Sequence, residues 1–243
     1  MNTDFYNSTL IEPKIWNISD YRNDSMYLIE GEEKSILFDT GMGTGNLKEY
    51  LKSLTNKPIE VIISHAHWDH IMQANQFEKV YMNHKEIELI KVFNMNIDYS
   101  YFLDIKDKEI INLGNRVLEV MEVPGHTPGS IILLDDENKI VLSGDAIGAG
   151  HTWMHLPGCL SLSRYVNSLY KLYERIKDYR KIYHGHLRER GPLNIDYLKD
   201  LIIAVEKVIK KELVGEPYPY GNFEGFYVTY GTATLVYNPE NID

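Results

Sequence analysis

Short apolar runs separated by turn residues dominate the first third of the chain, and longer amphipathic stretches occur in both halves. Apolar runs of about four to eight residues are typical of strands, whereas apolar positions that recur about every three to four residues are typical of helices. On these criteria strands are predicted at residues 14–19, 26–30, 35–38, 59–64, 80–82, 117–123, 130–134, 139–142 and 181–182, with two more between 223 and 237. Helices are predicted at residues 47–54, 84–92, 161–176 and 195–211. Strands mixed with helices in both halves indicate two sheets packed face to face with helices outside.

The composition of the 243-residue chain is ordinary for a globular protein, with 44% hydrophobic and 25% charged residues. The formal net charge of −10 disfavours a nucleic acid partner, because phosphate contacts need clustered Lys and Arg. A single cysteine, Cys159, excludes an internal disulfide and a cysteine-rich zinc module. The N-terminal residues are polar, and no run approaches the about 18 apolar residues that span a membrane. We therefore expect a soluble, cytoplasmic protein without a membrane partner.

Residues 93–103 interrupt the regular pattern, because Tyr99, Tyr101 and Phe102 stand among Asn, Asp and Ser. This composition suits a lid, a pocket wall or an interface in a homo-oligomer, although packing against the domain is the commoner fate of such residues. We predict a single domain over residues 1–243, with a candidate lid at 93–103.

The apolar run at 59–64 leads directly into His65-Ala66-His67-Trp68-Asp69-His70, which places four candidate metal ligands within six positions. Neutral imidazole and carboxylate together suit zinc, iron or manganese. The spacing allows His65 and His67 to converge on one ion while Asp69 and His70 face a second. The alternative is a cluster of solvated surface histidines, which we disfavour because only 9 of the 243 residues are histidine.

Further candidate ligands follow other predicted strands, each next to a glycine. His126 lies in a Pro-Gly turn after 117–123, Asp145 follows 139–142, and His186 follows the short strand at 181–182. Glycine allows the backbone to come close to a neighbouring group. Any one of these residues alone would be interpreted as a turn residue, but their recurrence at strand ends predicts a shared metal site.

This set of residues, with Phe38-Asp39-Thr40-Gly41 upstream, resembles the signature of the metallo-β-lactamase-fold hydrolases over residues from about 35 to 190. The resemblance implies an α+β fold, a four-layer αββα sandwich with the site at one edge between the two sheets. It also implies two divalent metal ions, with zinc expected and manganese or iron as alternatives. The ligands of the first ion would be His65, His67 and His126. The ligands of the second would be Asp69, His70 and His186, with Asp145 bridging both ions.

Other residues near these motifs have supporting roles in this interpretation. In proteins of this family the residue at Asp39 orients a ligand histidine and does not bind metal. His184 stands where relatives often carry proline, and we expect it to line the pocket or to support a ligand. Four more residues are candidates for the wall of an apolar pocket, although core packing is equally consistent with each one alone: Trp68, His151, Trp153 and His155.

The function implied is hydrolysis by a metal-bridging hydroxide, because metal binding lowers the pKa of water and neither serine nor cysteine is then needed. Asp69 is the predicted catalytic residue, which orients the hydroxide and relays its proton. We predict a hydrolase of a small ester, thioester or lactone, similar to the glyoxalase II and acyl-homoserine-lactone lactonase branches. One alternative is a phosphodiesterase acting on a small phosphodiester or RNA. Arg188 and Arg190 favour this alternative, because they could bind a phosphate group. Another is an iron-dependent persulfide dioxygenase.

Overall fold

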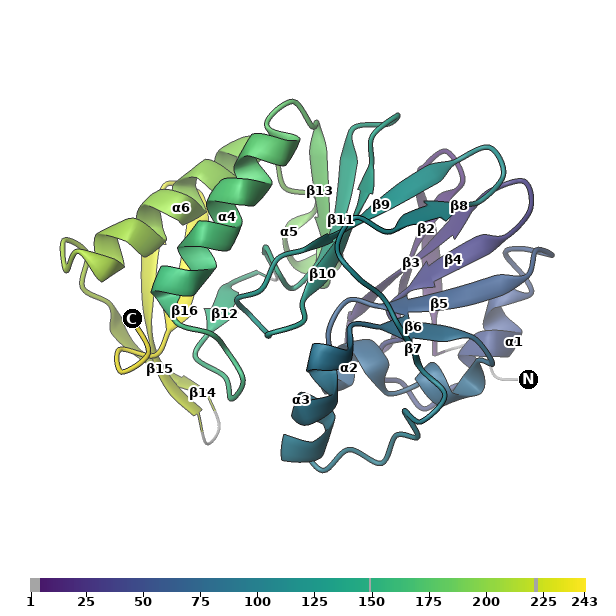
Figure 1. Ribbon diagram of the computed structural model, residues 1–243, viewed down its shortest axis with the longest axis horizontal. Coiled ribbons are helices and arrows are strands. Elements are labelled where there is room, and N and C mark those ends of the chain that lie inside the picture. Colours follow the sequence, from purple (N-terminus) through teal and green to yellow (C-terminus); the bar gives the residue numbers. More distant parts are fainter. Residues whose placement is uncertain (1–4, 149, 221–222) are drawn as a thin grey trace.

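The computed structural model describes residues 5–148, 150–220 and 223–243, which form three β-sheets with helices around them (Figure 1). The seven-stranded sheet has the order β1 (Asn7–Glu12), β2 (Ile15–Ser19), β3 (Ser25–Glu30), β4 (Ser35–Phe38), β5 (Ile59–Ile63), β6 (Val80–Met82) and β7 (Leu103–Asp104). The five-stranded sheet has the order β13 (Lys181–His184), β11 (Ile140–Gly144), β10 (Ile131–Asp135), β9 (Val117–Glu122) and β8 (Ile110–Asn112). The four-stranded sheet has the order β12 (Thr152–Met154), β16 (Ala233–Tyr237), β15 (Phe223–Tyr230) and β14 (Glu216–Tyr220).

Two long helices and several short ones pack on these sheets. The helices are α1 (Leu47–Leu51), α2 (Trp68–Ile71), α3 (Ile87–Val92), α4 (Leu162–Ile176), α5 (Leu187–Arg190) and α6 (Ile195–Ile209), with 3₁₀ turns η1 (Ala74–Gln76) and η2 (His84–Glu86). Capping side chains fix where the long helices begin. Ser161 accepts a hydrogen bond from Arg164 N at the start of α4, and Asn194 accepts one from Tyr197 N at the start of α6.

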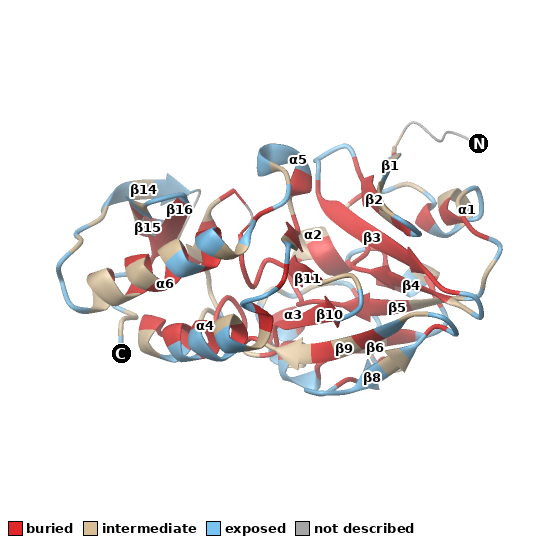
Figure 2. Cartoon of the chain, turned by 90° about the horizontal axis from the view of Figure 1, so that it is seen from above, coloured by how far each residue is buried: buried red, intermediate tan, exposed pale blue. Residues whose placement is uncertain are grey.

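The central strands β3 and β4 of the larger sheet and β10 and β11 of the five-stranded sheet are buried on both faces, in keeping with the four-layer αββα arrangement predicted from the sequence (Figure 2). In β3, Met26 and Leu28 point toward the cluster that contains residues of α1, α2 and α3. Tyr27 and Ile29 point the other way, into the core shared with the five-stranded sheet. A third cluster joins the outer face of the five-stranded sheet to α4 and α6.

The carboxyl ends of several strands meet at one edge of this sandwich. β4, β5 and β6 are parallel neighbours in one sheet, and β11 and β13 are parallel neighbours in the other. Parallel neighbours deliver the segments that follow them to the same side of a sheet. Motifs that are far apart in the sequence therefore come together at this edge.

The four-stranded C-terminal sheet is the part of the fold that the sequence pattern predicted least well. The strands β15 and β16 are confirmed, but β12 and β14 were not predicted. β12 has only three residues, and β14 contains Pro217 and Pro219, which argue against a strand. Proline is compatible with an edge strand, and β14 pairs only with β15. One hydrophobic cluster joins this sheet to α4 and α6, which also pack on the outer face of the five-stranded sheet.

The aromatic segment at 93–103 contributes to the core as well as to the surface. Ile97 and Phe102 are buried in the cluster under α3, and Tyr99 and Tyr101 pack against that cluster. Phe93, at the end of α3, turns toward the predicted metal site instead. Across the described residues, every helix is too short or too polar to span a membrane.

A buried ion pair joins the first strand to the five-stranded sheet. The Glu12 carboxylate accepts two hydrogen bonds from Arg180, at 2.9 and 2.8 Å, and one each from Lys181 and Tyr183. The Arg180 guanidinium lowers the pKa of Glu12 to about 2, from its ordinary value of 4.5. Arg180 and Lys181 are thus paired within the fold.

We expect Glu12→Gln to lower the free energy of unfolding at pH 7 by about 1 kcal/mol, the order of a bidentate, partly buried pair. Because the folded pKa is depressed, the stabilisation is complete above about pH 4.5 and is lost as the pH falls toward 2. Urea denaturation at pH 7 and pH 3.5 measures the difference between wild type and variant. Glu88→Gln, which removes an exposed pair with Lys91, is the control. An equal difference at both pH values would contradict this account.

Candidate metal centre

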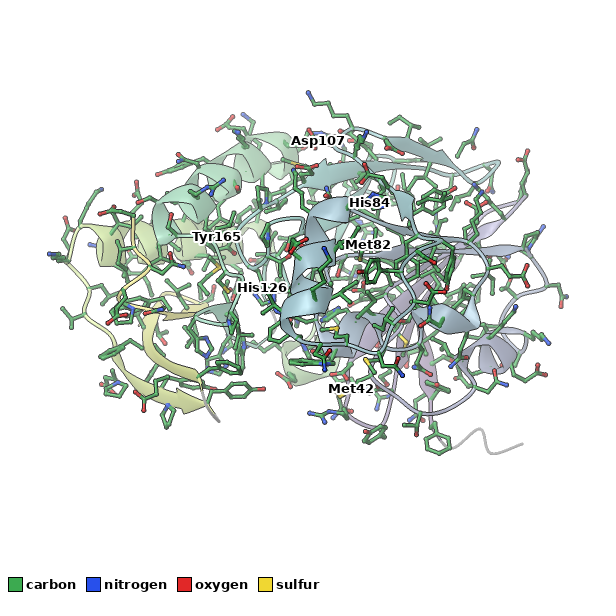
Figure 3. The ribbon with its side chains drawn as sticks, turned by 60° about the horizontal axis from the view of Figure 1, so that its bottom comes forward. Met42, Met82, His84, Asp107, His126 and Tyr165 are labelled. Atoms are coloured by element: carbon green, nitrogen blue, oxygen red, sulfur yellow. The ribbon has the colours of Figure 1, made fainter. Side chains whose placement is uncertain are left out.

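The predicted ligands lie just beyond the carboxyl ends of strands from both sheets of the sandwich. His65 follows β5, Asp145 follows β11, and His186 follows β13. His126 lies in the turn between β9 and β10, near the middle of the molecule in Figure 3. Together they form two groups whose donor atoms lie within 4.8 Å of one another in each: His65, His67 and His126, and Asp69, His70, Asp145 and His186.

In the first group, three buried imidazoles point at a common position. His65 Nε2 lies 3.0 Å from His67 Nδ1, and His126 Nε2 lies 2.9 Å from the same atom. These separations are close to the spacing of ligands around one zinc ion, whose bonds to nitrogen are about 2.0–2.1 Å long.

The tautomers of His65 and His126 leave the lone pair of each Nε2 directed at the common position of the first group. His126 Nδ1 donates to the Trp153 carbonyl at 2.6 Å, so its Nε2 carries no proton in the neutral ring. His65 Nδ1 donates to Ser64 Oγ at 2.9 Å, because that hydroxyl gives its own proton to a carboxylate. Burial lowers the pKa of His126 and lowers that of His67 to about 3. The rings are therefore neutral, as metal ligands must be.

In the second group, carboxylates surround two imidazoles. His186 Nε2 lies 3.3 Å from Asp69 Oδ2 and 3.4 Å from Asp145 Oδ2. His70 Nε2 and Asp145 Oδ1, 3.5 Å apart, are buried and have no hydrogen-bond partner among the described residues. Burial lowers the pKa of His70, but the negative charges of Asp69 and Asp145 outweigh burial and raise this pKa well above its ordinary value. The field that favours an imidazolium also favours a divalent cation, so this donor set fits a metal ion.

Asp39 positions the second group. Its Oδ2 accepts from His70 Nδ1 at 2.7 Å, and its Oδ1 accepts from Ser64 N at 2.7 Å. The residue has a φ of 67°, which is uncommon for a residue other than glycine. Because Asp39 holds the Nδ1 proton, His70 presents Nε2 to the other ligands. The orienting contact predicted from the sequence is present.

Two glycines are required by the close approach of the ligand loops. A Cβ at Gly185 would lie 2.1 Å from Asp145 Oδ1 and 2.7 Å from His70 Cε1. Gly144 has a φ of 50°, and a Cβ there would lie 2.5 Å from Ser64 Oγ. A side chain at either position would push the ligand loops apart.

Glu86 is a supporting residue that sequence reasoning missed. Its carboxylate is fully buried and accepts from Ala66 N at 2.7 Å and from Gly129 N at 2.6 Å. It therefore ties the loop of His65 and His67 to the loop of His126. The sequence offered no signal for it, because one glutamate in a predicted helix is normally a solvated residue.

Five residues of the two groups line a cavity of about 490 Å³: His67, Asp69, His126, Asp145 and His186. The lining residues come from both halves of the chain and include Met42, which Figure 3 labels: Arg22, Asp24, Met42, His67, Trp68, Asp69, Phe93, His126, Asp145, His151, Trp153, Leu156, His186, Glu189, Tyr218, Tyr220 and Phe223. Ligand cavities of this size hold small molecules.

The other predicted site residues differ in whether they line the cavity. Trp68, His151 and Trp153 line the cavity. His155 lies next to Trp153, with ring centroids 5.3 Å apart, but is buried outside the cavity lining. His184 is buried in the turn before α5, where its Nε2 donates to Gly191 O at 3.0 Å.

Two charged residues near the second group were also missed. Asp24 Oδ1 lies 3.7 Å from His186 Nδ1, and Arg22 lines the same end of the cavity. Burial raises the pKa of Asp24 to about 7, and the Asp69 and Asp20 carboxylates add to the rise. These residues belong to the turn between β2 and β3, in which the sequence shows only turn-forming residues.

Cys159 does not have the surroundings of a nucleophile. Burial raises the pKa of its thiol to about 12, and its Sγ donates to the Trp153 carbonyl at 3.6 Å. A protonated, buried thiol is inert.

Comparisons with known proteins agree with this geometry. A family model described as the metallo-beta-lactamase superfamily matches residues 21–211. The chain is 28% identical over 207 residues to the acyl-coenzyme A thioesterase MBLAC2 of Homo sapiens, covering 69% of this chain and 74% of that protein. It is 24% identical over 134 residues to the hydroxyacylglutathione hydrolase of Francisella tularensis, covering 55% of this chain and 51% of that protein. The fold is similar to that of a metallo-beta-lactamase from Pontibacter korlensis, with a TM-score of 0.69 at 17% identity, covering 83% of this chain and 99% of that one.

We expect Asp39→Asn to weaken zinc binding at the second group by about 10- to 100-fold, because His70 loses the carboxylate that orients it. Competition with a chromophoric chelator measures the two affinities. Asp135→Asn is the matched control, since Asp135 is equally buried but lies at the end of β10 away from the His126 turn. An equal loss in both variants, or none in Asp39→Asn, would contradict the positioning role.

Proposed function

This chain belongs to the metallo-beta-lactamase superfamily of metal-dependent hydrolases, and we propose that it hydrolyses a small thioester with two bound divalent ions. Esters and lactones are the related substrates. Zinc is the metal we propose, with manganese and iron as alternatives, because imidazole and carboxylate serve all three.

The observation that carries the proposal is the lining of the cavity. Among the described residues that form it, none is Ser, Thr, Cys or Lys, the side chains that most often form an acyl-enzyme, and Asp69 and Asp145 belong to the proposed metal-binding groups. The attacking group is therefore water, and the reaction is a hydrolysis without a covalent enzyme intermediate. The seven residues of the two groups would hold the divalent ions, which would supply Lewis acidity and lower the pKa of bound water.

Asp69 is the residue we assign to proton transfer. It belongs to the second group, lines the cavity, and has its Oδ2 3.3 Å from His186 Nε2. Burial raises its pKa, but the charge of His70 and the hydrogen bond from His186 outweigh that effect and lower it. The ionised carboxylate can accept a proton from the attacking water. As the bond between carbon and sulfur breaks, that proton passes to the sulfur, and the products are a carboxylic acid and a thiol.

The charges around the cavity favour a neutral carbonyl substrate over a phosphodiester. Arg22 is the one cationic side chain of the described lining, and it lies beside Asp24, with Glu189 also in the wall. Arg188 and Arg190 are outside that lining. The proposed metal ions would attract a phosphodiester as well as a carbonyl oxygen, but beyond them the described lining sets a single Arg side chain against the Asp24 and Glu189 carboxylates. The thioesterase and hydroxyacylglutathione hydrolase among the relatives support the choice of a thioester.

A matched substrate panel tests the proposal. Protein loaded with zinc is assayed with a thioester of N-acetylcysteamine, the oxygen ester of the same acyl group, a lactone and bis(p-nitrophenyl) phosphate. We expect the highest kcat/KM for the thioester, with release of one free thiol for each acid formed. A phosphodiester that is hydrolysed faster than all carbonyl substrates would overturn the proposal.

We expect Asp69→Asn to lower kcat for the thioester by about 100-fold or more, the usual size of a proton-transfer contribution. Metal content is measured on the same samples, so that loss of a proton acceptor is separated from loss of an ion. Asp178→Asn, at the exposed end of α4, is the control. Near-full turnover of Asp69→Asn with two ions bound would refute the assigned role.

A further inference from the structure

Aromatic and charged side chains line the cavity in two regions that meet at Tyr220, whose hydroxyl is affected by the charges of Asp69, Arg22 and Asp24. Aromatic rings adjoin the first group of ligands: the Phe93 ring lies 5.7 Å from that of His67, and the Trp153 carbonyl accepts from His126. Charged side chains adjoin the second group, where Asp24 lies 3.7 Å from His186. A substrate whose reacting carbon lies over the metal groups would therefore extend one arm over aromatic rings and the other toward charges.

The aromatic end is built mainly by the C-terminal sheet. Trp153 of β12 packs edge-to-face on Tyr220 of β14, with centroids 4.3 Å apart, and its centroid lies 6.0 Å from that of Tyr218. His155 supports the indole from its buried side, at 5.3 Å. We call Trp153, Tyr218 and Tyr220 the aromatic wall. Edge-to-face pairs at these distances are mutually stabilising, so the wall holds its shape without a ligand.

The sequence of β14 places both tyrosines of the aromatic wall on one face of the strand. Pro217 and Pro219 alternate with Tyr218 and Tyr220, so the tyrosines share one face of the strand. Proline has no N–H, and a strand that tolerates two prolines must direct those positions away from its neighbour. The free edge of β14 therefore lacks donors for pairing with another chain. What the strand offers is its tyrosine face, which lines the cavity.

We propose that the aromatic wall is the acyl-binding subsite and that it selects neutral, apolar acyl groups about the size of a hexanoyl chain or a phenyl ring. This assignment rests on the proposed thioester hydrolysis. The rings bury apolar surface, which is the main source of affinity for such groups. An anionic acyl group would lose its hydration against these rings, and the charges of Arg190 and Glu189 near His151 oppose one another. The polar thiol arm then lies at the end of Arg22 and Asp24.

Binding without turnover tests the subsite directly. Non-hydrolysable S-methyl, S-hexyl and S-(5-carboxypentyl) thioethers of N-acetylcysteamine are titrated into the zinc-loaded protein by calorimetry. We expect the hexyl compound to bind about 10-fold or more tightly than the methyl compound, and the carboxypentyl compound to lose most of that gain. Equal affinity for all three would overturn the proposal.

Two wall variants and one control locate the effect. Tyr220→Ala removes a side chain that is 46% exposed, and Trp153→Leu keeps the carbonyl that accepts from His126. Both should reduce the gain of hexyl over methyl to about 3-fold or less. Tyr170→Ala, an exposed tyrosine on α4, should keep the full gain. Retention of the gain in both wall variants would place the subsite elsewhere and refute the assignment.

The acyl-subsite assignment and the proposed thioester hydrolysis can be refuted independently of each other. The hexanoyl and acetyl thioesters of N-acetylcysteamine are assayed in parallel with the titrations. If the wall variants lose the binding gain but the wild type hydrolyses neither thioester, the proposed function is wrong and the wall still binds apolar groups. If both thioesters are hydrolysed and the wall variants keep the preference for hexanoyl, the function stands and the subsite assignment is wrong.

Discussion

The convergence of buried lone pairs and carboxylates at one edge of the sandwich is the constraint on which the rest of the structure depends. Asp69 and Asp145 lie within a few ångströms of His70 and His186, and His70 Nε2 and Asp145 Oδ1 have no hydrogen-bond partner in the part of the chain that the structure describes. Burying such groups is costly unless a cation balances them. Much of the surrounding chain serves to hold this arrangement, including a carboxylate that orients one ligand and glycines that permit the contact. The fold thus brings together a donor set that metal ions complete.

Trp153 connects the metal site to the substrate cavity. Its carbonyl fixes the tautomer of His126, and its indole forms the centre of the aromatic wall. A displacement of β12 would change both the ligand and the wall. The C-terminal sheet therefore does more than extend the fold, because it carries the surface that distinguishes this cavity from a bare metal site. Glu86 has the corresponding role for the other loops, which it joins through two buried backbone N–H groups.

The candidate ligand set could be proposed from the sequence because histidines are rare, because four candidate ligands lie within residues 65–70, and because His126, Asp145 and His186 each follow a predicted strand next to a glycine. Asp39 could be predicted only through the family resemblance. Glu86, Asp24 and Arg22 could not, since single charged residues in turns and helices look like solvated positions until the fold buries them. The aromatic wall was missed in part because two prolines hid β14 as a strand. His155 was grouped with the pocket residues by its neighbours in sequence, whereas the structure buries it next to Trp153 and outside the cavity lining.

The central claim is that the two donor groups each hold one divalent ion, and metal content tests it most directly. Protein purified without added metal is analysed by elemental mass spectrometry beside His70→Ala, which removes a ligand of the second group only. The account predicts about two equivalents of zinc or manganese per wild-type chain, falling toward one in the variant. About one equivalent of iron in the wild type, unchanged in His70→Ala, would contradict a dinuclear site and the hydrolytic chemistry built on it.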